Sequence, residues 1–191
     1  MLILQLIAGG FYLLNKVFLS LAERARRSGN EDNARSWRIA SWVVYLIGLP
    51  PWVILFGIWH NWIAMSVEAS AAPAMVVGLI SALHGTDKKV PSWLDRLAII
   101  CVPLGFAYSL HDFGGLTKLT QWLEIGTVIG FLVGTYQLAK ERTNRYLWFV
   151  LMHLSCGALF WVQHSPWLVL HQTVSLAFIV DAHLTQRRTK S

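Results

Sequence analysis

The chain has 191 residues, of which 55% are hydrophobic and 14% are charged. This composition leaves too little polar surface to cover a soluble globule, so it excludes an ordinary soluble domain. A formal net charge of +6 would favour nucleic-acid binding in a soluble protein. Here the placement of the basic residues has another explanation, given below, and we expect no nucleic-acid partner.

Apolar segments follow one another along the whole chain, and each can cross a bilayer as a helix, which takes about 20 residues. The seven segments cover approximately residues 2–21, 39–58, 62–83, 96–110, 121–138, 146–163 and 166–184. The fourth is the weakest, because it is short and contains Pro103 and Gly105. The sequence therefore predicts an all-α integral membrane protein with seven transmembrane helices, whose surroundings are the lipid bilayer.

The basic residues predict how these helices are oriented. Fourteen of the sixteen Lys and Arg residues lie in the first, third and fifth gaps between segments or in the C-terminal tail. Because Lys and Arg remain on the cytoplasmic side, we expect the N-terminus outside and the C-terminus in the cytoplasm, in the cell (inner) membrane. Residues 2–21 lack a basic n-region and are predicted to be an N-outside anchor, not a cleaved signal peptide. Tryptophans near the predicted boundaries form an aromatic belt: Trp59, Trp62, Trp122, Trp161 and Trp167 outside, Trp37 and Trp93 inside.

Segments one to three resemble segments five to seven. Trp42 lies in the second segment as Trp148 lies in the sixth, 106 residues later, and Trp62 begins the third as Trp167 begins the seventh, 105 residues later. We interpret this as two parallel three-helix repeats joined by a connector helix, since an odd number of connecting helices restores the direction. The predicted parts are residues 1–84 as the first repeat, 85–117 as a cytoplasmic loop and connector helix, and 118–191 as the second repeat and tail.

This three-plus-one-plus-three layout resembles that of the SWEET-type sugar carriers and, more closely, the Pnu-type bacterial vitamin transporters. The resemblance rests on Asn144-Arg145-Tyr146-Leu147-Trp148, on His164-Ser165-Pro166-Trp167-Leu168 followed by Gln172, and on the stretch 61–69. In the sixth segment, His153, Ser155 and Cys156 stand where that family typically has a second Trp and an Asn or Asp. The resemblance implies a transporter of a vitamin or nucleoside such as nicotinamide riboside.

Polar residues at membrane depth are the candidate binding residues. At 1.5 Å per residue, Glu68 lies about 9 Å below the predicted outer boundary, and His171 and Gln172 lie about 6 to 8 Å below it. A carboxylate at such depth costs about 3 kcal/mol and rarely faces lipid. We therefore expect a substrate pocket between the two halves, in which Glu68 accepts substrate hydroxyls or a cation and Gln172 offers its amide. The alternative is a hydrogen bond that only joins helices.

Other intramembrane polar residues have weaker signals. His153 lies near the bilayer midplane, where a neutral imidazole can bind a ligand or carry a proton. Lys16, toward the cytoplasmic end of the first segment, is expected to snorkel to the interface. Asp112, Glu124 and Asp181 lie near segment ends, and solvation is their ordinary explanation.

Prolines and deep aromatic residues complete the predicted site. Pro50 and Pro51 remove two backbone donors and are expected to break the second segment in mid-membrane, as a hinge or cavity wall, with Gly157 at the equivalent place in the sixth. Several aromatic residues lie too deep for the belt or at its margin: Trp42, Tyr45, Trp52, Tyr108, Tyr136 and Trp148. Of these, Tyr45, Trp52 and Trp148 are the predicted substrate contacts, because such rings can stack on a flat heterocycle.

No signature of catalysis is present: there is no Walker loop, no GxSxG elbow and no HExxH. The sequence predicts no enzyme, no catalytic residue, no cofactor and no metal site, but facilitated transport of a small polar or aromatic metabolite. Two alternatives stay open. One is a non-transporting accessory or orphan membrane protein, and the other is an electron-transfer protein with His153 and His171 as axial haem ligands. Ion coupling and a homo-oligomer are also left open.

Cysteine-accessibility labelling tests the predicted topology. Five positions would be changed singly to Cys: Ser28, Ser92, Thr117, Ser165 and Thr189. Only Thr117→Cys and Ser165→Cys should react with an impermeant thiol reagent added outside intact cells. Reaction at Thr189→Cys would overturn the orientation and the parallel repeats with it, because the basic tail would then lie outside.

Overall fold

The computed structural model describes residues 2–84, 92–139, 142 and 144–190, and within these ranges it contains seven α-helices and no strand. The helices are α1 (Leu2–Arg27), α2 (Glu31–Ile58), α3 (Trp62–His84), α4 (Ser92–Phe113), α5 (Leu119–Ala139), α6 (Arg145–Val162) and α7 (Pro166–Lys190). Five of them, α1, α2, α3, α6 and α7, are long and apolar enough to cross a membrane. The predicted all-helical class is confirmed, and its apolar helices fit a membrane protein.

The first helix boundary shows how local sequence ends one helix and begins the next. Gly29 adopts a left-handed φ of 76°, and the N–H of Asn30 donates to the carbonyl of Ala25, which closes the end of α1. The side chain of Asn30 then accepts from the N–H of Asn33 at 3.0 Å and caps α2. Glu31 and Asp32 lie in the first turn of α2, where negative charge favours the helix dipole.

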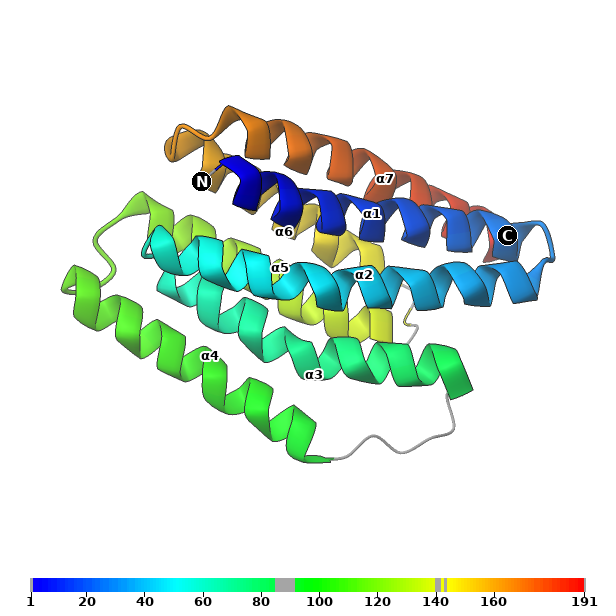
Figure 1. Cartoon of the computed structure of the whole chain (residues 1–191), viewed down its shortest axis with the longest axis horizontal. Coiled ribbons are helices and arrows are strands. Elements are labelled where there is room, and N and C mark those ends of the chain that lie inside the picture. The colour runs from blue at the N-terminus through cyan, green and yellow to red at the C-terminus, as the bar shows by residue number, and fades with distance from the viewer. Residues whose placement is uncertain (1, 85–91, 140–141, 143, 191) are drawn as a thin grey trace.

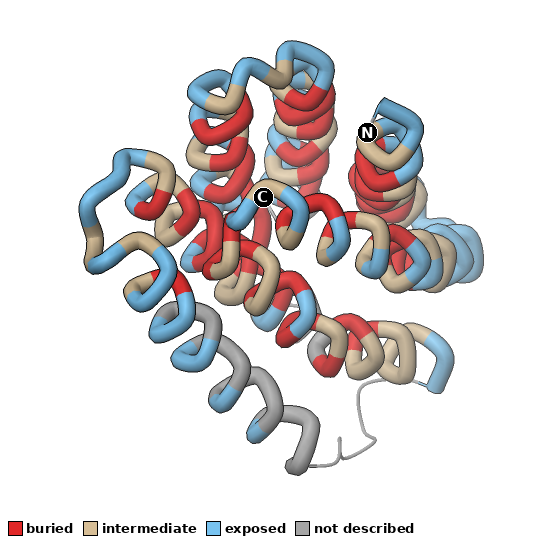
Figure 2. Tube along the Cα trace, turned by 60° about the vertical axis from the view of Figure 1, so that its left-hand side comes forward, coloured by how far each residue is buried: buried red, intermediate tan, exposed pale blue. Residues whose placement is uncertain are grey.

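Helices that follow one another in sequence run antiparallel, as Figure 1 shows. In the described part of the chain, six of them form a closed ring in the order α1, α2, α3, α5, α6, α7 and back to α1. The helix α4 lies outside this ring and packs on α3. Figure 2 shows the consequence for burial: buried positions lie on the sides of the ring helices that face one another, whereas the described positions of α4 are mostly exposed.

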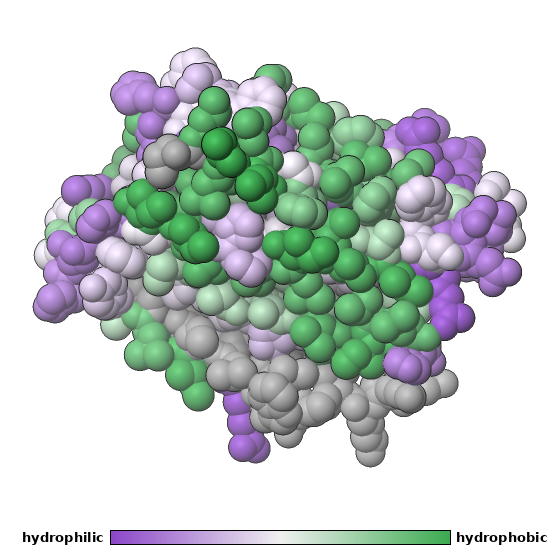
Figure 3. Space-filling view, viewed as in Figure 1, coloured by the Kyte–Doolittle hydropathy of each residue, from purple (hydrophilic) through white to green (hydrophobic). Residues whose placement is uncertain are grey.

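The two ends of the ring differ in chemistry. One end carries Arg24, Arg27, Arg145 and Arg188 and is called the basic end below. The other carries the two short turns 59–61 and 163–165 and is called the turn end. Figure 3 shows mainly apolar residues between these two polar ends. Exposed leucine, isoleucine and valine side chains between polar ends are what a bilayer-facing surface requires.

The two short turns have the same backbone structure. His60 and His164, 104 residues apart, are the described non-glycine residues with positive φ, at 56° and 54°. Each turn contains the same two backbone hydrogen bonds. In the first, the N–H of His60 donates to the carbonyl of Gly57, and the N–H of His164 donates to that of Trp161. In the second, the N–H of the residue after each histidine donates to the carbonyl five positions earlier. The spacing of 104 is one or two residues shorter than the spacing of the paired tryptophans.

Pro50 and Pro51 do not break α2, which is one continuous helix from Glu31 to Ile58. The expected interruption in mid-membrane is therefore wrong. Pro51 is half-buried and Pro50 is exposed. Neither residue can donate a helical hydrogen bond, and α2 packs against α1 and α3. Pro103 likewise lies inside a continuous α4.

Close approach of α5 and α6 depends on Gly130. A Cβ at this position would lie 2.5 Å from the backbone nitrogen of Met152 and 2.6 Å from the carbonyl oxygen of Trp148. These atoms belong to the backbone of α6 and cannot rotate away, so even one methyl group must push the two helices apart. Small residues at such crossings are typical of helix pairs in membranes.

We expect Gly130→Ala to lower the free energy of unfolding by about 1–3 kcal/mol, the usual effect of overpacking. Gly10→Ala is the matched control, because a Cβ there meets no atom within 4 Å. The measurement is thermal unfolding of both variants in the same detergent. Equal melting temperatures for the two variants would contradict the close α5–α6 contact.

Candidate functional site

A polar cavity lies inside the ring, and each of the six ring helices contributes to its wall. The lining consists of Tyr12 from α1, Trp52 and Phe56 from α2, Glu68 from α3, Thr127 from α5, Met152, His153 and Cys156 from α6, and His171 and Gln172 from α7. The space between these side chains is about 300 Å³ when all gaps between atoms are included, but only about 10 Å³ can hold the centre of a water molecule. The site is therefore narrow, with room for about one water.

Glu68 is the acidic residue of this cavity. It is buried, and its Oε2 accepts a hydrogen bond of 2.5 Å from the hydroxyl of Tyr12. The bond joins α1 to α3, two helices that are both neighbours of α2, so the carboxylate is held in place from a second helix. No second hydrogen bond to this carboxylate is present among the described residues, which leaves it capacity to accept from a ligand.

His153 and Gln172 form the second polar pair of the cavity. The Nδ1 of His153 lies 2.5 Å from the Oε1 of Gln172, so α6 and α7 are joined here. Because an amide oxygen only accepts, Nδ1 carries the hydrogen in this arrangement and Nε2 of the neutral ring is an acceptor. Both Nε2 of His153 and the indole Nε1 of Trp52 are buried without a hydrogen-bond partner. Such groups are rare in proteins and mark places where a ligand or water is expected.

Trp52 and Phe56 belong to the wall of the cavity, and Phe160, which is not part of the lining, packs with them. Trp52 stacks on Phe56 and on Phe160, with ring centroids 5.2 Å and 5.7 Å apart. Phe56 and Phe160 are nearly parallel, at 9°, and are themselves 104 residues apart. The ring of His171 lies 6.3 Å from that of Trp52. A flat ligand could stack on an aromatic ring here and also form hydrogen bonds with polar atoms.

The structure brings five of the predicted substrate residues together: Glu68, His153, His171, Gln172 and Trp52 all line the cavity. The other two predicted contacts lie outside its wall. Tyr45 packs behind Tyr12, with ring centroids 4.8 Å apart. Trp148 is half-buried and is not part of the lining.

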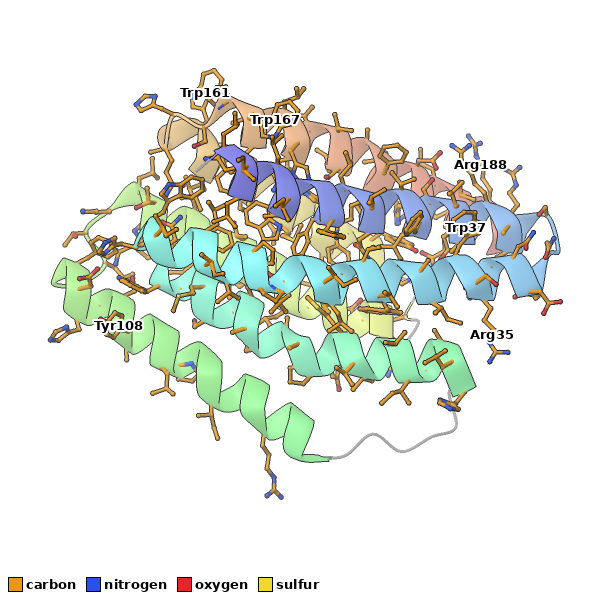
Figure 4. The ribbon with its side chains drawn as sticks, in the orientation of Figure 1. Arg35, Trp37, Tyr108, Trp161, Trp167 and Arg188 are labelled. Carbon is orange, nitrogen blue, oxygen red and sulfur yellow. The ribbon has the colours of Figure 1, made fainter. Side chains whose placement is uncertain are left out.

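Other aromatic and hinge candidates lie farther from the cavity. Trp42 is buried and packs on Tyr45. Tyr108 and Tyr136 are exposed, and the ring of Tyr108, labelled on α4 in Figure 4, packs on that of Trp62 with centroids 4.9 Å apart. Trp161 and Trp167 are exposed at the turn end and Trp37 at the basic end, as the predicted belt requires. Gly157 lies where α6 contacts α7, since a Cβ there would be 3.7 Å from that of Gln172.

Lys16 does not snorkel, contrary to expectation. It is fully buried, its Nζ donates to Oδ1 of Asn15 at 2.9 Å, and it lies 4.6 Å from the ring centroids of both Tyr45 and Phe149. Lys16 and Tyr12 lie one turn apart on the same face of α1. This face packs against α2 and is turned to the interior of the ring, so the side chain of Lys16 is directed inward.

The basic end of the ring is closed by a buried charge cluster that the sequence reading missed. Oε1 of Glu23 accepts from Arg38 at 2.9 Å, from Arg145 at 2.5 Å and from the hydroxyl of Tyr146 at 2.8 Å. The cluster joins α1, α2 and α6, and the three charged side chains are at most 6% exposed. From the sequence, both arginines count toward the predicted orientation, and Arg145 also belongs to the stretch that resembles the Pnu-type transporters, but neither is predicted to bind Glu23. Glu23 follows Tyr12, Lys16 and Leu19 on one helical face, and this spacing was the available signal.

The turn end is closed by hydrogen bonds between the two turns. Nε2 of Gln163 donates to Oδ1 of Asn61 at 2.9 Å. Beside it, the indole of Trp62 donates to Asp112 at 2.5 Å and holds the pKa of that carboxyl below its ordinary value. Asp112 is exposed, as expected, but it has these partners.

Two other carboxylates are paired where solvation was expected. Glu124 is buried, and its Oε2 accepts from the backbone N–H of Ala64, which caps the start of α3 from α5. Asp181 accepts from Arg24 at 2.9 Å and from Ser20 at 2.5 Å, which joins α7 to α1. The expectation failed because it considered each helix end alone, without the neighbouring helix.

Several lining residues were not predicted: Tyr12, Phe56, Thr127, Met152 and Cys156. They are ordinary membrane-helix residues in composition, and only their position on the faces turned to the ring interior distinguishes them. The haem alternative would need space for a porphyrin between His153 and His171, and the cavity that both residues line has no such space in this conformation. Within the described ranges, no group of three His, Cys, Asp or Glu side chains is placed to hold a metal ion.

Comparisons with protein-family models, with curated proteins and with solved structures found no match to this chain.

The Glu23 cluster yields a stability prediction. Glu23→Ala removes the carboxylate between two buried guanidinium groups, and loss of one partner from a buried ion pair lowers the free energy of unfolding by about 3–5 kcal/mol. Glu31→Ala, an exposed glutamate at the same end, is the control and should change it little. Thermal unfolding in detergent compares the two. A melting temperature of Glu23→Ala equal to that of the control would contradict the cluster.

Proposed function

We propose that this protein is a membrane facilitator that carries a small polar or aromatic metabolite through the ring of helices. The observation that supports this most strongly is the narrow cavity to which all six ring helices contribute. A polar contact that only joined two helices would not need side chains from a third helix. Here carboxylate, imidazole, amide and indole groups from four helices converge on one space. Four of their nitrogen atoms have no hydrogen-bond partner: Nε1 of Trp52, Nε2 of His153 and both ring nitrogens of His171.

The chemistry of the wall favours a flat substrate with hydrogen-bonding groups. Glu68 and Nε2 of His153 can accept hydrogen bonds from a substrate, and Nε1 of Trp52 can donate one. The stacked rings of Trp52, Phe56 and Phe160 supply faces for a planar heterocycle. A vitamin-like nucleoside or heterocycle fits this description, and the resemblance to the Pnu-type transporters adds nicotinamide riboside as the leading candidate.

Transport requires that the closed site open to each side in turn. The cavity lies between two polar contacts, the Glu23 cluster at the basic end and the Asn61–Gln163 bond at the turn end. We infer that these are the two gates and that one opens while the other stays closed. Because the Glu23 cluster joins α1 and α2 to α6, and Asn61–Gln163 joins the two turns, each contact connects the first three helices to the last three.

The packing of the ring supports two related halves. If α1, α2 and α3 correspond to α5, α6 and α7, each contact in the ring has its counterpart: α1 with α2 and α5 with α6, α2 with α3 and α6 with α7, α3 with α5 and α7 with α1. The spacing of 104 in the turns also makes Glu68 the counterpart of Gln172. Substrate would then be held between equivalent positions while the halves rock around it. Pro50, Pro51 and Gly157 are the proposed hinge residues.

In this proposal α4 is the connector and all seven helices span the membrane. The basic end faces the cytoplasm, the turn end faces outward, and the protein lies in the cell (inner) membrane. The positive charges of the basic end and the exposed tryptophans at both ends support this placement.

Uptake into liposomes tests the proposal. Purified protein would be reconstituted and supplied with a panel of labelled vitamins and nucleosides, nicotinamide riboside among them. At least one compound should accumulate to equilibrium faster than in empty liposomes. Glu68→Gln should slow that uptake by about tenfold or more, because a buried polar partner left unsatisfied costs about 1–3 kcal/mol.

The control variant is Glu31→Gln, which makes the same chemical change at an exposed position of α2. It should leave uptake unchanged, and thermal unfolding should show that both variants are folded. Equal uptake by Glu68→Gln and wild type, or no uptake of any compound, would contradict the proposed function.

A further inference from the structure

Glu68 is a buried carboxyl group in the cavity wall to which no positively charged side chain is bonded. In the described part of the chain its hydrogen-bond donor is the hydroxyl of Tyr12, a neutral group, at 2.5 Å. The ion pairs found there lie toward the two ends of the bundle, and none of them includes Glu68. The buried Glu23 differs, because its carboxylate accepts from two arginines.

The titratable groups on the neighbouring helices do not supply the missing charge. On α6 and α7, Nε2 of His153 and both ring nitrogens of His171 are buried without a partner, whereas a protonated imidazole needs an acceptor for each N–H. Tyr45 on α2, Glu124 on α5 and Cys156 on α6 can lose a proton but cannot become positively charged.

The basic group of this region is Lys16 on α1, which is bonded elsewhere. Its Nζ donates to Oδ1 of Asn15 at 2.9 Å and lies 6.0 Å from the ring centroid of Tyr12. Tyr12 is therefore next to both groups: its ring is near the ammonium of Lys16, and its hydroxyl is bonded to Glu68.

An ionised carboxylate in this position is much less stable than the protonated acid. Removal of a charge from water without a bonded counter-charge costs far more than removal of a neutral group that keeps a hydrogen bond. The narrow cavity has room for about one water, whereas a proton needs no space of its own. A proton on Oε1 leaves the bond from Tyr12 to Oε2 intact, and the acid can still accept a hydrogen bond from a substrate.

We propose that Glu68 binds a proton when the cavity closes around a substrate, and that one proton crosses the membrane with each substrate molecule. This inference rests on the transport function proposed above and adds its driving force. The proton comes from the solution on the side where substrate enters and forms the O–H bond of the acid. It returns to solution on the other side when the second gate opens. Ionisable residues inside membrane proteins are typical of such proton relays.

Coupling also requires that the empty site return without the proton, because a proton carried back would cancel the driving force. The ionised Glu68 then needs a positive charge from the protein. Lys16 is placed to supply it, since it is fully buried and lies one turn from Tyr12 on the same face of α1. Its flexible side chain allows the ammonium to move to Glu68 after substrate and proton have left.

Infrared spectroscopy of the full chain in lipid vesicles tests the proton on Glu68 without any substrate. At neutral pH, where an exposed glutamate is ionised, wild type should show the C=O band of a carboxylic acid that Glu68→Gln loses and the exposed control Glu31→Gln keeps. Tyr12→Phe should keep this band and move it to higher frequency, because the hydrogen bond to the carboxyl group is gone. If Glu68→Gln removes only a carboxylate band, or if Tyr12→Phe leaves the acid band unmoved, the proposal is overturned.

Gradient-driven uptake tests the coupling, with labelled nicotinamide riboside as the first probe and the other compounds of the vitamin and nucleoside panel after it. The membrane potential is clamped with potassium and valinomycin, and the outside is made more acidic by about one pH unit, which is worth a tenfold concentration ratio. Wild type should accumulate the compound about threefold or more above equilibrium, and a protonophore should abolish this excess. Lys16→Gln should lose the accumulation but keep the exchange of labelled for unlabelled compound, because exchange needs no empty return.

Each failure has a different meaning. Wild-type uptake that does not respond to the pH gradient would overturn the coupling and leave the transport function standing. No uptake of any compound would contradict the transport function itself, whatever the infrared spectrum shows. Loss of exchange together with accumulation in Lys16→Gln would contradict the role of Lys16 in the empty return.

Discussion

A polar side chain inside an apolar helical bundle must find its partner within the bundle, and the whole arrangement of this protein follows from that constraint. Water and lipid cannot supply the missing hydrogen bonds. Five buried or partly buried polar contacts link different helices or the turns between them: Tyr12–Glu68, His153–Gln172, Glu23–Arg38–Arg145, Glu124–Ala64 and Asn61–Gln163. Together they determine which helices are neighbours, and the apolar faces fill the space between them.

The same constraint explains why the centre of the ring suits a ligand. Glu68 has one hydrogen-bond partner, and Trp52 Nε1 and His153 Nε2 have none. A substrate that supplies the missing partners would lower the free energy of the closed state. A compound that cannot supply them leaves the groups unpaired, and selectivity follows from this difference. The two proposed gates consist of polar contacts, which could exchange protein partners for water in the proposed opening.

The sequence was sufficient for some of this picture and insufficient for the rest. Hydropathy and the placement of arginines predicted the helices and the grouping of Arg24, Arg27 and Arg188 at one end. Depth counted from Trp62 and Trp167 placed Glu68 and Gln172 at similar levels, and both line the cavity. The depth of a residue in the membrane can be counted along a helix because the rise per residue is fixed.

What depth cannot predict is the direction of a side chain or its partner on another helix. Lys16 was expected at the interface and is buried, because its face of α1 turns inward. Arg38 and Arg145 were interpreted as orientation signals, although their partner Glu23 lies on the same inward face. Trp148 and Tyr45 lie at a suitable depth. Trp148 on α6 is turned away from the cavity, and Tyr12 covers Tyr45 on its cavity side. Such outcomes depend on how helices are rotated about their axes, which long-range contacts decide.

The reactivity of Cys156 tests most directly whether the closed cavity opens toward both ends. Cys156 is buried in the cavity wall, and with Cys101 changed to Ser it is the single thiol of the chain. We expect slow reaction with a small impermeant thiol reagent added to either side of reconstituted vesicles. Asn61→Ala, which removes the gate contact at the turn end, should speed the reaction from that side by about fivefold or more and slow it, or leave it unchanged, from the other. A thiol that stays unreactive from both sides in both proteins would show a permanently sealed interior and contradict a transport pathway through the ring.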